Sequence, residues 1–120
     1  MYNTINLAEK FALIDSYWAP RIVAELNGQY VKLAKVKGEF VWHQHGHEDE
    51  MFLVHRGELV IRMRDGDVTV GEGEFFVVPR GVEHAPYAAG ETELVLFEPK
   101  ATAHTGEIIS DQTVHAQEWI

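Results

Sequence analysis

Residues 38–57 read GEFVWHQHGHEDEMFLVHRG, and residues 73–84 read GEFFVVPRGVEH. The first segment contains a pair of histidines, His43 and His45, within a run (39–45) that is predicted as a strand. Side chains at positions i and i+2 of a strand point to the same face. The two imidazoles are therefore expected to project side by side, as two ligands of one metal ion must.

Two further residues complete a candidate set of metal ligands. Glu50 follows Gly46, where the chain can turn, and its carboxylate returns to the same cavity if Glu50 begins the next strand. His84 lies beyond the break at Pro79 and Gly81, on a different strand. Three imidazoles and one carboxylate suit a divalent first-row transition metal ion, namely iron, manganese, nickel, cobalt, copper or zinc. An octahedral ion held by these groups would keep open positions for water, dioxygen or a chelating substrate.

The N-terminal segment favours a short helix within residues 3–18, because apolar residues recur there at helical spacing. Asn6, followed three positions later by Glu9, resembles a capping box. Pro20 ends any continuation of the helix, since it lacks an N–H and restricts the residue before it.

The rest of the chain reads as short strands separated by tight turns. Asn27-Gly28 and Asp65-Gly66 are typical of two-residue hairpin turns. Many short strands at close spacing predict an all-β sandwich or barrel. Besides residues 39–45, the predicted strands are 21–26, 29–37, 51–54, 58–64, 67–70, 75–78 and 92–98.

The two quoted segments resemble the two sequence motifs of the cupins. The first segment contains, in the order of the first cupin motif, Gly38, the His-x-His pair, the glutamate and Gly57. The second segment, 73–84, contains the glycine, Pro-x-Gly and histidine of the second motif. Fifteen residues separate Gly57 from Gly73, a short spacing typical of small bacterial cupins. Two departures are a residue missing after Gly38 and Ala88 in place of the usual Asn. The resemblance implies a jelly-roll β-barrel whose metal ligands are His43, His45, Glu50 and His84.

Length and motif placement indicate one cupin domain over residues 1–120, with its motif core at 38–88. An N-terminal helix and arm (1–20) and a weakly patterned tail (100–120) flank that core. The tail is expected to return along the barrel or to dock on a neighbouring subunit. Aromatic and apolar residues in the arm and tail predict a homodimer, and the alternative is that both segments pack on their own barrel. These residues are Phe11, Tyr17, Trp18, Trp119 and Ile120.

Composition narrows the possible partners. The formal net charge of −9 and the lack of a Lys/Arg cluster argue against nucleic acid and anionic membrane surfaces. With no cysteine, any metal site must use nitrogen and oxygen ligands. We find neither a secretory signal nor an apolar run long enough for a membrane helix, so we expect a cytoplasmic protein.

Several polar residues near the motifs are interpreted without a metal role. His47 lies in a polar, glycine-containing loop and is expected in solvent; it and Glu83 would be candidate proton shuttles if either reached the cavity. His55 has the strand parity opposite to Glu50 and should point away from the site. The others, expected to be solvated, are Glu48, Asp49, His104 and His115.

Three functions remain open at this point. The favoured one is an enzyme that uses an open metal site on a small oxygen-rich molecule, with dioxygenase, isomerase or decarboxylase chemistry, although no catalytic residue can be named. The second is a non-catalytic cupin that binds or senses a small molecule, and the ligand set could also be vestigial. The third is a sugar-phosphate isomerase, which needs a cationic pocket. Arg62 and Arg64 share the polar face of a predicted strand, so only Arg80 could serve there.

Overall fold

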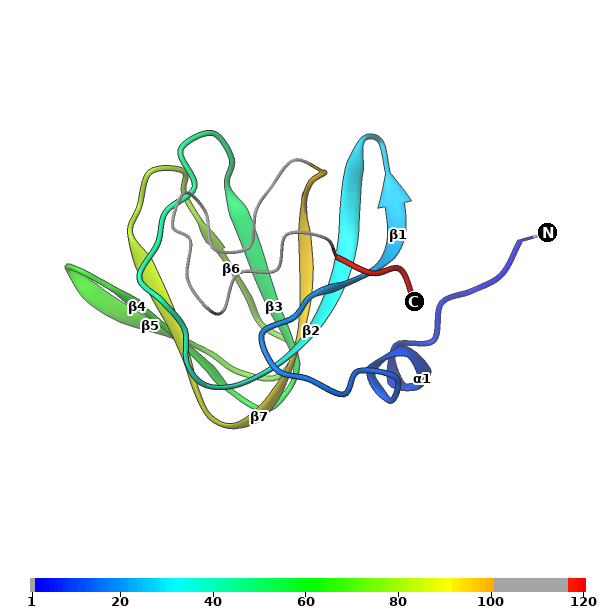
Figure 1. The fold of residues 1–120 in the computed structure, drawn as a ribbon. Helices are drawn as coiled ribbons and strands as arrows, with labels where there is room; N and C mark the ends of the chain where they lie inside the picture. Colours follow the sequence, from blue (N-terminus) through cyan, green and yellow to red (C-terminus); the bar gives the residue numbers. More distant parts are fainter. Residues whose placement is uncertain (1, 101–116) are drawn as a thin grey trace.

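The computed structural model describes residues 2–100 and 117–120. The tail between them lies outside the described residues, and so do the predicted surface residues His104 and His115. The described part contains one short helix and seven strands (Figure 1). In chain order these are α1 (Leu7–Phe11), β1 (Arg21–Leu26), β2 (Gln29–Glu39), β3 (Glu50–Arg56), β4 (Leu59–Met63), β5 (Gly66–Val70), β6 (Phe75–Val78) and β7 (His84–Pro99).

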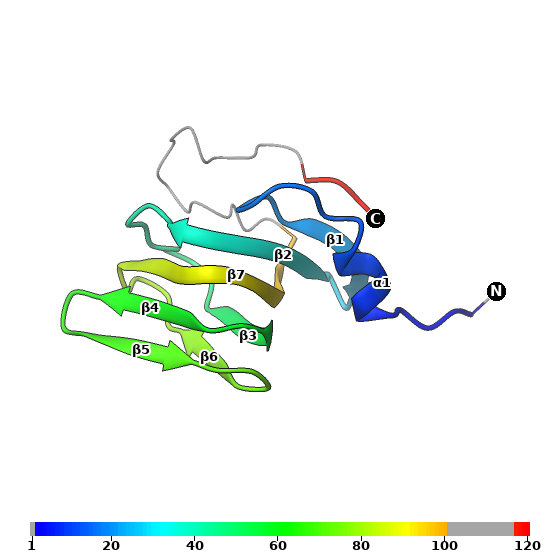
Figure 2. The ribbon, with the colours of Figure 1, turned by 90° about the horizontal axis from the view of Figure 1, so that it is seen from below.

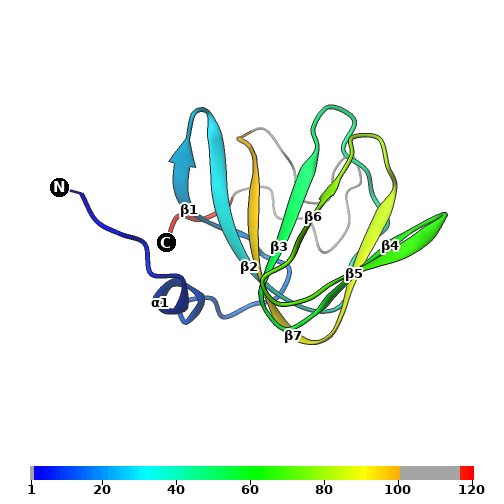
Figure 3. The ribbon, with the colours of Figure 1, turned by 180° about the vertical axis from the view of Figure 1, so that it is seen from behind.

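The strands form an antiparallel jelly-roll β-barrel organised around β7. The C-terminal half of β7 lies between β2 and β3, giving the order β1-β2-β7-β3-β6. Its N-terminal half pairs with β4, which in turn pairs with β5. Figure 2 shows β1, β2, β7, β4 and β5 side by side, and Figure 3 shows β3 with β6 at its edge. The predicted all-β jelly roll with a short N-terminal helix is therefore confirmed.

Alternate residues of each strand point into the barrel and form its core. The polar face predicted for Arg62 and Arg64 is confirmed, because neither is buried, while Leu59 and Ile61 on the opposite face are fully buried. On β7, Leu94 and Leu96 face inward in the same way. The core that results is apolar, and apart from Thr92 its buried polar side chains lie at the end with the candidate ligands. Its other buried members are Ala34, Val36, Phe52, Val54, Val70, Val78 and Ala88.

The helix α1 covers part of the outer face of the barrel. It is shorter than the predicted segment 3–18, and Pro20 is not what ends it. Asn6 caps the helix by accepting a hydrogen bond from the Glu9 backbone N–H at 3.0 Å, as the sequence indicates. The helix ends at Phe11, which is buried against Leu33. The chain then reaches β2 again at Trp18, whose backbone N–H donates to the Lys35 carbonyl. Phe11 thus packs on its own barrel, which is the alternative stated for this residue, and the homodimer stays a prediction.

Three predicted boundaries need correction. Residues 39–45 are not a strand beyond the end of β2, because His43 makes only an isolated bridge to His84. The turn between β4 and β5 is Arg64-Asp65 rather than Asp65-Gly66, since Met63 pairs with Gly66. Strand β7 begins at His84, eight residues before the predicted start, and runs through Pro86. Proline weakens a strand signal, yet neighbouring strands on both sides stabilise the extended backbone here.

The far end of the chain returns to the first strand. The backbone N–H of Ile22 donates to the Glu118 carbonyl at 2.7 Å, and the Ile120 N–H donates to the Ile22 carbonyl at 3.0 Å. Figure 1 shows this terminal segment beside β1.

In the described part of the chain, no helix is both long enough and apolar enough to span a membrane.

Gly57, between β3 and β4, offers a test of the barrel's close packing. Replacing Gly57 by alanine would put a Cβ 2.5 Å from Thr92 Oγ1 on a backbone with φ of +93°. Left-handed backbone costs a non-glycine residue about 1–2 kcal/mol, and overpacking adds about 1–3 kcal/mol. We therefore expect Gly57→Ala to lower the free energy of unfolding, measured by urea denaturation, by the sum of these two costs.

The matched control for this substitution is Gly28→Ala. Gly28 has a similar φ of +78° but no atom within 4 Å of its would-be Cβ. It should show the backbone loss alone. Equal losses in the free energy of unfolding for the two variants would mean that the residues around Gly57 shift to accommodate the added Cβ without an energetic penalty.

Candidate metal centre

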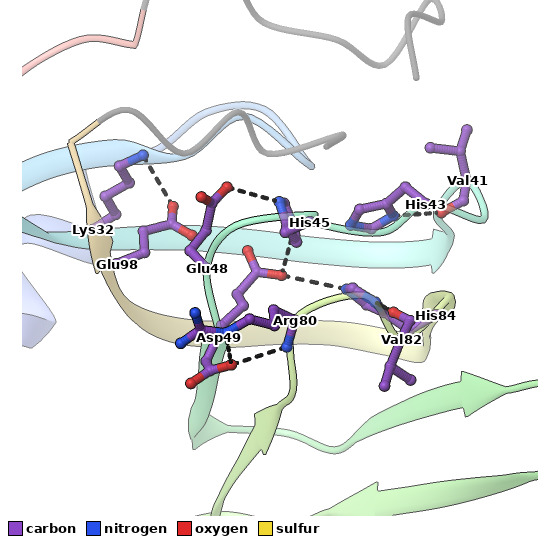
Figure 4. Close-up of polar contacts among 11 residues, drawn as sticks. Lys32, Val41, His43, His45, Glu48, Asp49, Arg80, Val82, His84 and Glu98 are labelled. Atoms are coloured by element: carbon purple, nitrogen blue, oxygen red, sulfur yellow. Dashed lines mark hydrogen bonds and ion pairs between the residues drawn. The ribbon is translucent and has the colours of Figure 1, made fainter. Parts of the chain in front are cut away.

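The structure brings the four candidate ligands together at one end of the barrel interior. The ligand atoms of His43, His45, Glu50 and His84 all lie within 4.8 Å of one another. Each side chain is at most 4% exposed. The residues come from the loop after β2, the first position of β3 and the first position of β7. In Figure 4, dashed lines from His45 and His84 meet at one carboxylate oxygen, and the contact distances identify this atom as Oε1 of Glu50.

Backbone contacts orient two of the histidines. His43 and His84 form a bridge in which each backbone N–H donates to the other's carbonyl at 2.9 Å. Their Nδ1 atoms lie 2.8 Å from the Val41 carbonyl and 2.9 Å from the Val82 carbonyl, respectively. A carbonyl accepts only from a protonated nitrogen, so both rings carry a proton on Nδ1 and direct Nε2 into the cluster, where the Nε2 of His84 faces Glu50. Metal-binding histidines are commonly held in this way.

His45 and Glu50 contact each other directly. His45 Nε2 lies 3.0 Å from Glu50 Oε1, and His84 Nε2 lies 3.3 Å from the same oxygen. The second ring nitrogen of His45, Nδ1, is 3.7 Å from Glu48 Oε1 and has no hydrogen bond. The backbone of this loop is tied to the other motif, because the Gly81 N–H donates to the His45 carbonyl at 2.8 Å. One carboxylate oxygen thus faces two imidazole nitrogens at close range.

The electrostatics of the cluster favour neutral imidazole at one position and a charged carboxylate at another. Burial, together with the nearby His84, lowers the pKa of His43 to about 4, so this ring is neutral at pH 7. Burial raises the pKa of Glu50, but hydrogen bonds from His45 and His84 outweigh it and the net shift is downward. Burial lowers the pKa of His45, but the hydrogen bond and the charge of Glu50 outweigh burial, so the net shift of the His45 pKa is upward. An ionised carboxylate among imidazoles is the state in which such residues bind a metal.

A buried ion pair beside the cluster was not singled out from the sequence. Lys32 Nζ lies 2.9 Å from Glu98 Oε1, and both side chains are at most 2% exposed. No well-directed hydrogen bond reaches the Glu98 oxygens, so electrostatic attraction to the Lys32 ammonium holds the pair. Burial and the charge of Glu50 raise the pKa of Glu98 well above its usual range. In Figure 4 this pair lies on the opposite side of His45 from His43.

The sequence signal that could have identified this pair is the alternation of inward-facing and outward-facing positions along a strand. Lys32 shares its face of β2 with the core residues Ala34 and Val36. Glu98 shares its face of β7 with Leu94 and Leu96. Charged residues at core-facing positions are unusual, and they are rarely fully buried without a partner.

The other polar residues considered from the sequence lie outside the cluster. His47 and Glu83 are exposed, so neither reaches the cavity as a proton shuttle. Arg80 is exposed too, and its backbone N–H and Nε both contact Asp49 Oδ1, which places it away from a phosphate pocket. His55 points outward as predicted, stacks on Phe11 and contacts Glu93 at 2.9 Å.

A cavity inside the barrel adjoins the cluster. His43 and Glu50 are its charged or ionisable lining residues, and the remaining lining is apolar or aromatic. Trp18 and Pro20 reach it from the segment between α1 and β1. The arrangement therefore combines a nitrogen-and-oxygen donor set with an apolar space next to it, as small-molecule sites usually do.

Comparison with known proteins gives consistent results. A family model described as Cupin domain matches residues 29–100. The crystal structure of a cupin-2 domain containing protein from Shewanella frigidimarina is 47% identical, with a TM-score of 0.79, and the match covers 80% of this chain and 94% of that one. The uncharacterized protein YdbB of Bacillus subtilis is 36% identical over 63 residues, which are 52% of this chain and 56% of that protein. The chain thus spans little more than half the length of that curated relative.

A more distant structure shares only the fold. The crystal structure of the hydroquinone 1,2-dioxygenase PnpCD in complex with Fe³⁺ is 17% identical, with a TM-score of 0.73. The match covers 83% of this chain and 33% of that one.

Proposed function

The chain belongs to the cupin domain family, and on that premise we propose that His43, His45, Glu50 and His84 bind one divalent transition metal ion. The observation that carries the proposal is the convergence of four buried ligand atoms within 4.8 Å. Three nitrogens and one carboxylate oxygen fit first-row ions from manganese to zinc. The Nδ1 contacts to backbone carbonyls add support, because they orient the Nε2 atoms of His43 and His84 toward the cluster.

We further propose that the metal serves an enzyme acting on a small oxygen-rich molecule. Such an ion polarises a bound oxygen or activates water or dioxygen. The protein's own residues would bind and orient the substrate and exclude water, since the cluster is buried and the adjoining cavity is apolar. Dioxygenase, isomerase and decarboxylase chemistry all fit this description. The iron in the hydroquinone dioxygenase structure is the reason to test iron first.

The two alternatives receive different support. A non-catalytic binding protein would use the same metal and cavity, and only turnover distinguishes it from the enzyme. The sugar-phosphate isomerase is disfavoured, because Arg80 is exposed and pairs with Asp49 rather than lining the cavity. The homodimer and the cytoplasmic location stay predictions.

Metal content and metal-dependent stability test the proposal. Protein purified without a metal-affinity tag is expected to contain about one transition metal ion per chain by elemental analysis. After removal of the metal with a chelator, adding it back at a hundred times its Kd should raise the free energy of unfolding by about 2.7 kcal/mol, seen as a higher Tm. A chain that holds no metal and gains no stability from manganese, iron, cobalt, nickel, copper or zinc would overturn it.

A further inference from the structure

The segment between α1 and β1 places an aromatic side chain over the cavity beside the metal ligands. Trp18 is half-buried and packs against the barrel core. Its ring stacks on Phe40, with centroids 4.6 Å apart and planes inclined by 20°. Phe40 in turn contacts the His43 ring edge-on, with centroids 5.3 Å apart. The three rings form a continuous wall from this segment to the metal ligands.

The position of Trp18 is held by the backbone and by its own N–H. Trp18 has a φ of +58°, a left-handed conformation that bulky residues rarely adopt. Its backbone N–H donates to the Lys35 carbonyl at 2.9 Å, and its Nε1–H donates to the Lys37 carbonyl at 2.9 Å. Strained backbone that is held by several contacts is found most often at functional sites. The indole is therefore fixed in place rather than loosely packed.

The cavity that Trp18 lines is small and mostly apolar. Its volume is about 30 Å³. A single water needs about 10–15 Å³, so the cavity suits a group of a few heavy atoms and is too small to enclose a phenyl ring. Besides the indole and Pro20, the apolar lining includes Ala34, Val36, Phe40, Phe52, Leu94 and Leu96.

We propose that this cavity selects the substrate: a compact molecule with an oxygen-rich head that binds the metal and a small alkyl group that enters the cavity, with Trp18 setting the upper size. The polar head belongs at His43 and Glu50, which line the same cavity. The alkyl group would meet apolar side chains on its other sides. This inference rests on the proposed metal site, because the head must be held there.

The test uses 2-hydroxy acids that share one chelating head and differ in their side group. Glycolate, lactate, 2-hydroxyisovalerate and mandelate carry hydrogen, methyl, isopropyl and phenyl, respectively. Affinities are measured by titration calorimetry on protein loaded with Zn²⁺, which has no redox chemistry. We expect a gain of about fourfold for each buried carbon from glycolate to 2-hydroxyisovalerate. Mandelate should bind at least about tenfold more weakly than 2-hydroxyisovalerate, since its ring exceeds the cavity.

Replacing Trp18 by alanine should reverse the preference for size. Trp18→Ala is expected to bind mandelate at least about tenfold more tightly than the wild type and to bind glycolate with unchanged affinity. If the alanine variant fails to fold, Trp18→Phe, which keeps a ring against Phe40, should show a smaller shift in the same direction. Trp119→Ala is the matched control, because Trp119 is 56% exposed and does not line the cavity.

The outcomes separate this inference from the proposed metal site. Protein that cannot be loaded with Zn²⁺, judged by elemental analysis, contradicts the metal site itself. Loaded protein whose affinity is absent or independent of the side group overturns the inference while leaving the metal site standing. An unchanged order of affinities in both Trp18 variants would also overturn it.

Discussion

Replacing His45 by glutamine is expected to lower metal affinity at least about a hundredfold, and activity should fall with metal content. The reason is that His45 Nε2 points at Glu50 from within the buried cluster, so its loss removes a ligand and leaves the carboxylate with one imidazole contact fewer. Loss of residues that merely support a ligand typically costs 10–100-fold in affinity. Competition with a fluorescent chelator measures the metal affinity directly.

His47→Gln is the matched control for His45→Gln. It makes the same chemical change two residues away, on an exposed side chain outside the cluster. Metal affinity should stay within experimental error of the wild type. If His45→Gln kept full affinity, or if His47→Gln lost it, the assignment of ligands in this loop would be wrong.

Replacing Lys32 by methionine should cost about 3–5 kcal/mol in the free energy of unfolding. The substitution keeps the apolar stem but leaves Glu98 buried near Glu50 without its cation, so the loss applies at a pH above the raised pKa of Glu98, where the carboxylate is uncompensated. Urea denaturation of metal-free protein gives the value without a contribution from the ion. Lys37→Met is the control on the same strand, because Lys37 is exposed, and it should change stability by less than about 0.5 kcal/mol.

A double substitution separates the ion pair from the space it fills. Lys32→Met combined with Glu98→Met removes both charges, and buried ion pairs can often be replaced by apolar residues without loss. We expect the double variant to recover most of the stability lost by Lys32→Met. A double variant as unstable as the single one would show that packing, rather than the unpaired Glu98 carboxyl group, causes the loss.

Local signals predicted much of the fold because they depend on few neighbours. The hairpin at Asn27-Gly28 forms as expected, with both residues at positive φ and Leu26 paired with Gln29. Strand β6 matches its predicted bounds. The four candidate ligands were named from spacing and from the resemblance to cupins, and the structure brings them together.

Features that depend on distant contacts escaped prediction. The first half of β7 contains proline, alanine and glycine, which are poor strand formers, and pairing with β2 and β4 makes it a strand. His43 and His45 were expected on a regular strand, yet a bridge to His84 positions this part of the loop. The roles of Lys32 and Trp18 depend on which side chains face them across the barrel. Tertiary contacts of this kind leave only weak traces in a single sequence.

The long strand β7 has a consequence for the order in which the protein folds. Its C-terminal half pairs with β2 from Gln29↔Pro99 onward, so the chain between those partners must close into one large loop. Closing a long loop costs entropy before its contacts repay it, which makes such pairings slow. His43, His45 and Glu50 are neighbours along the chain, whereas His84 joins them only when β7 has docked. A half-folded chain therefore offers an incomplete set of ligands, and the complete donor set is a property of the closed barrel.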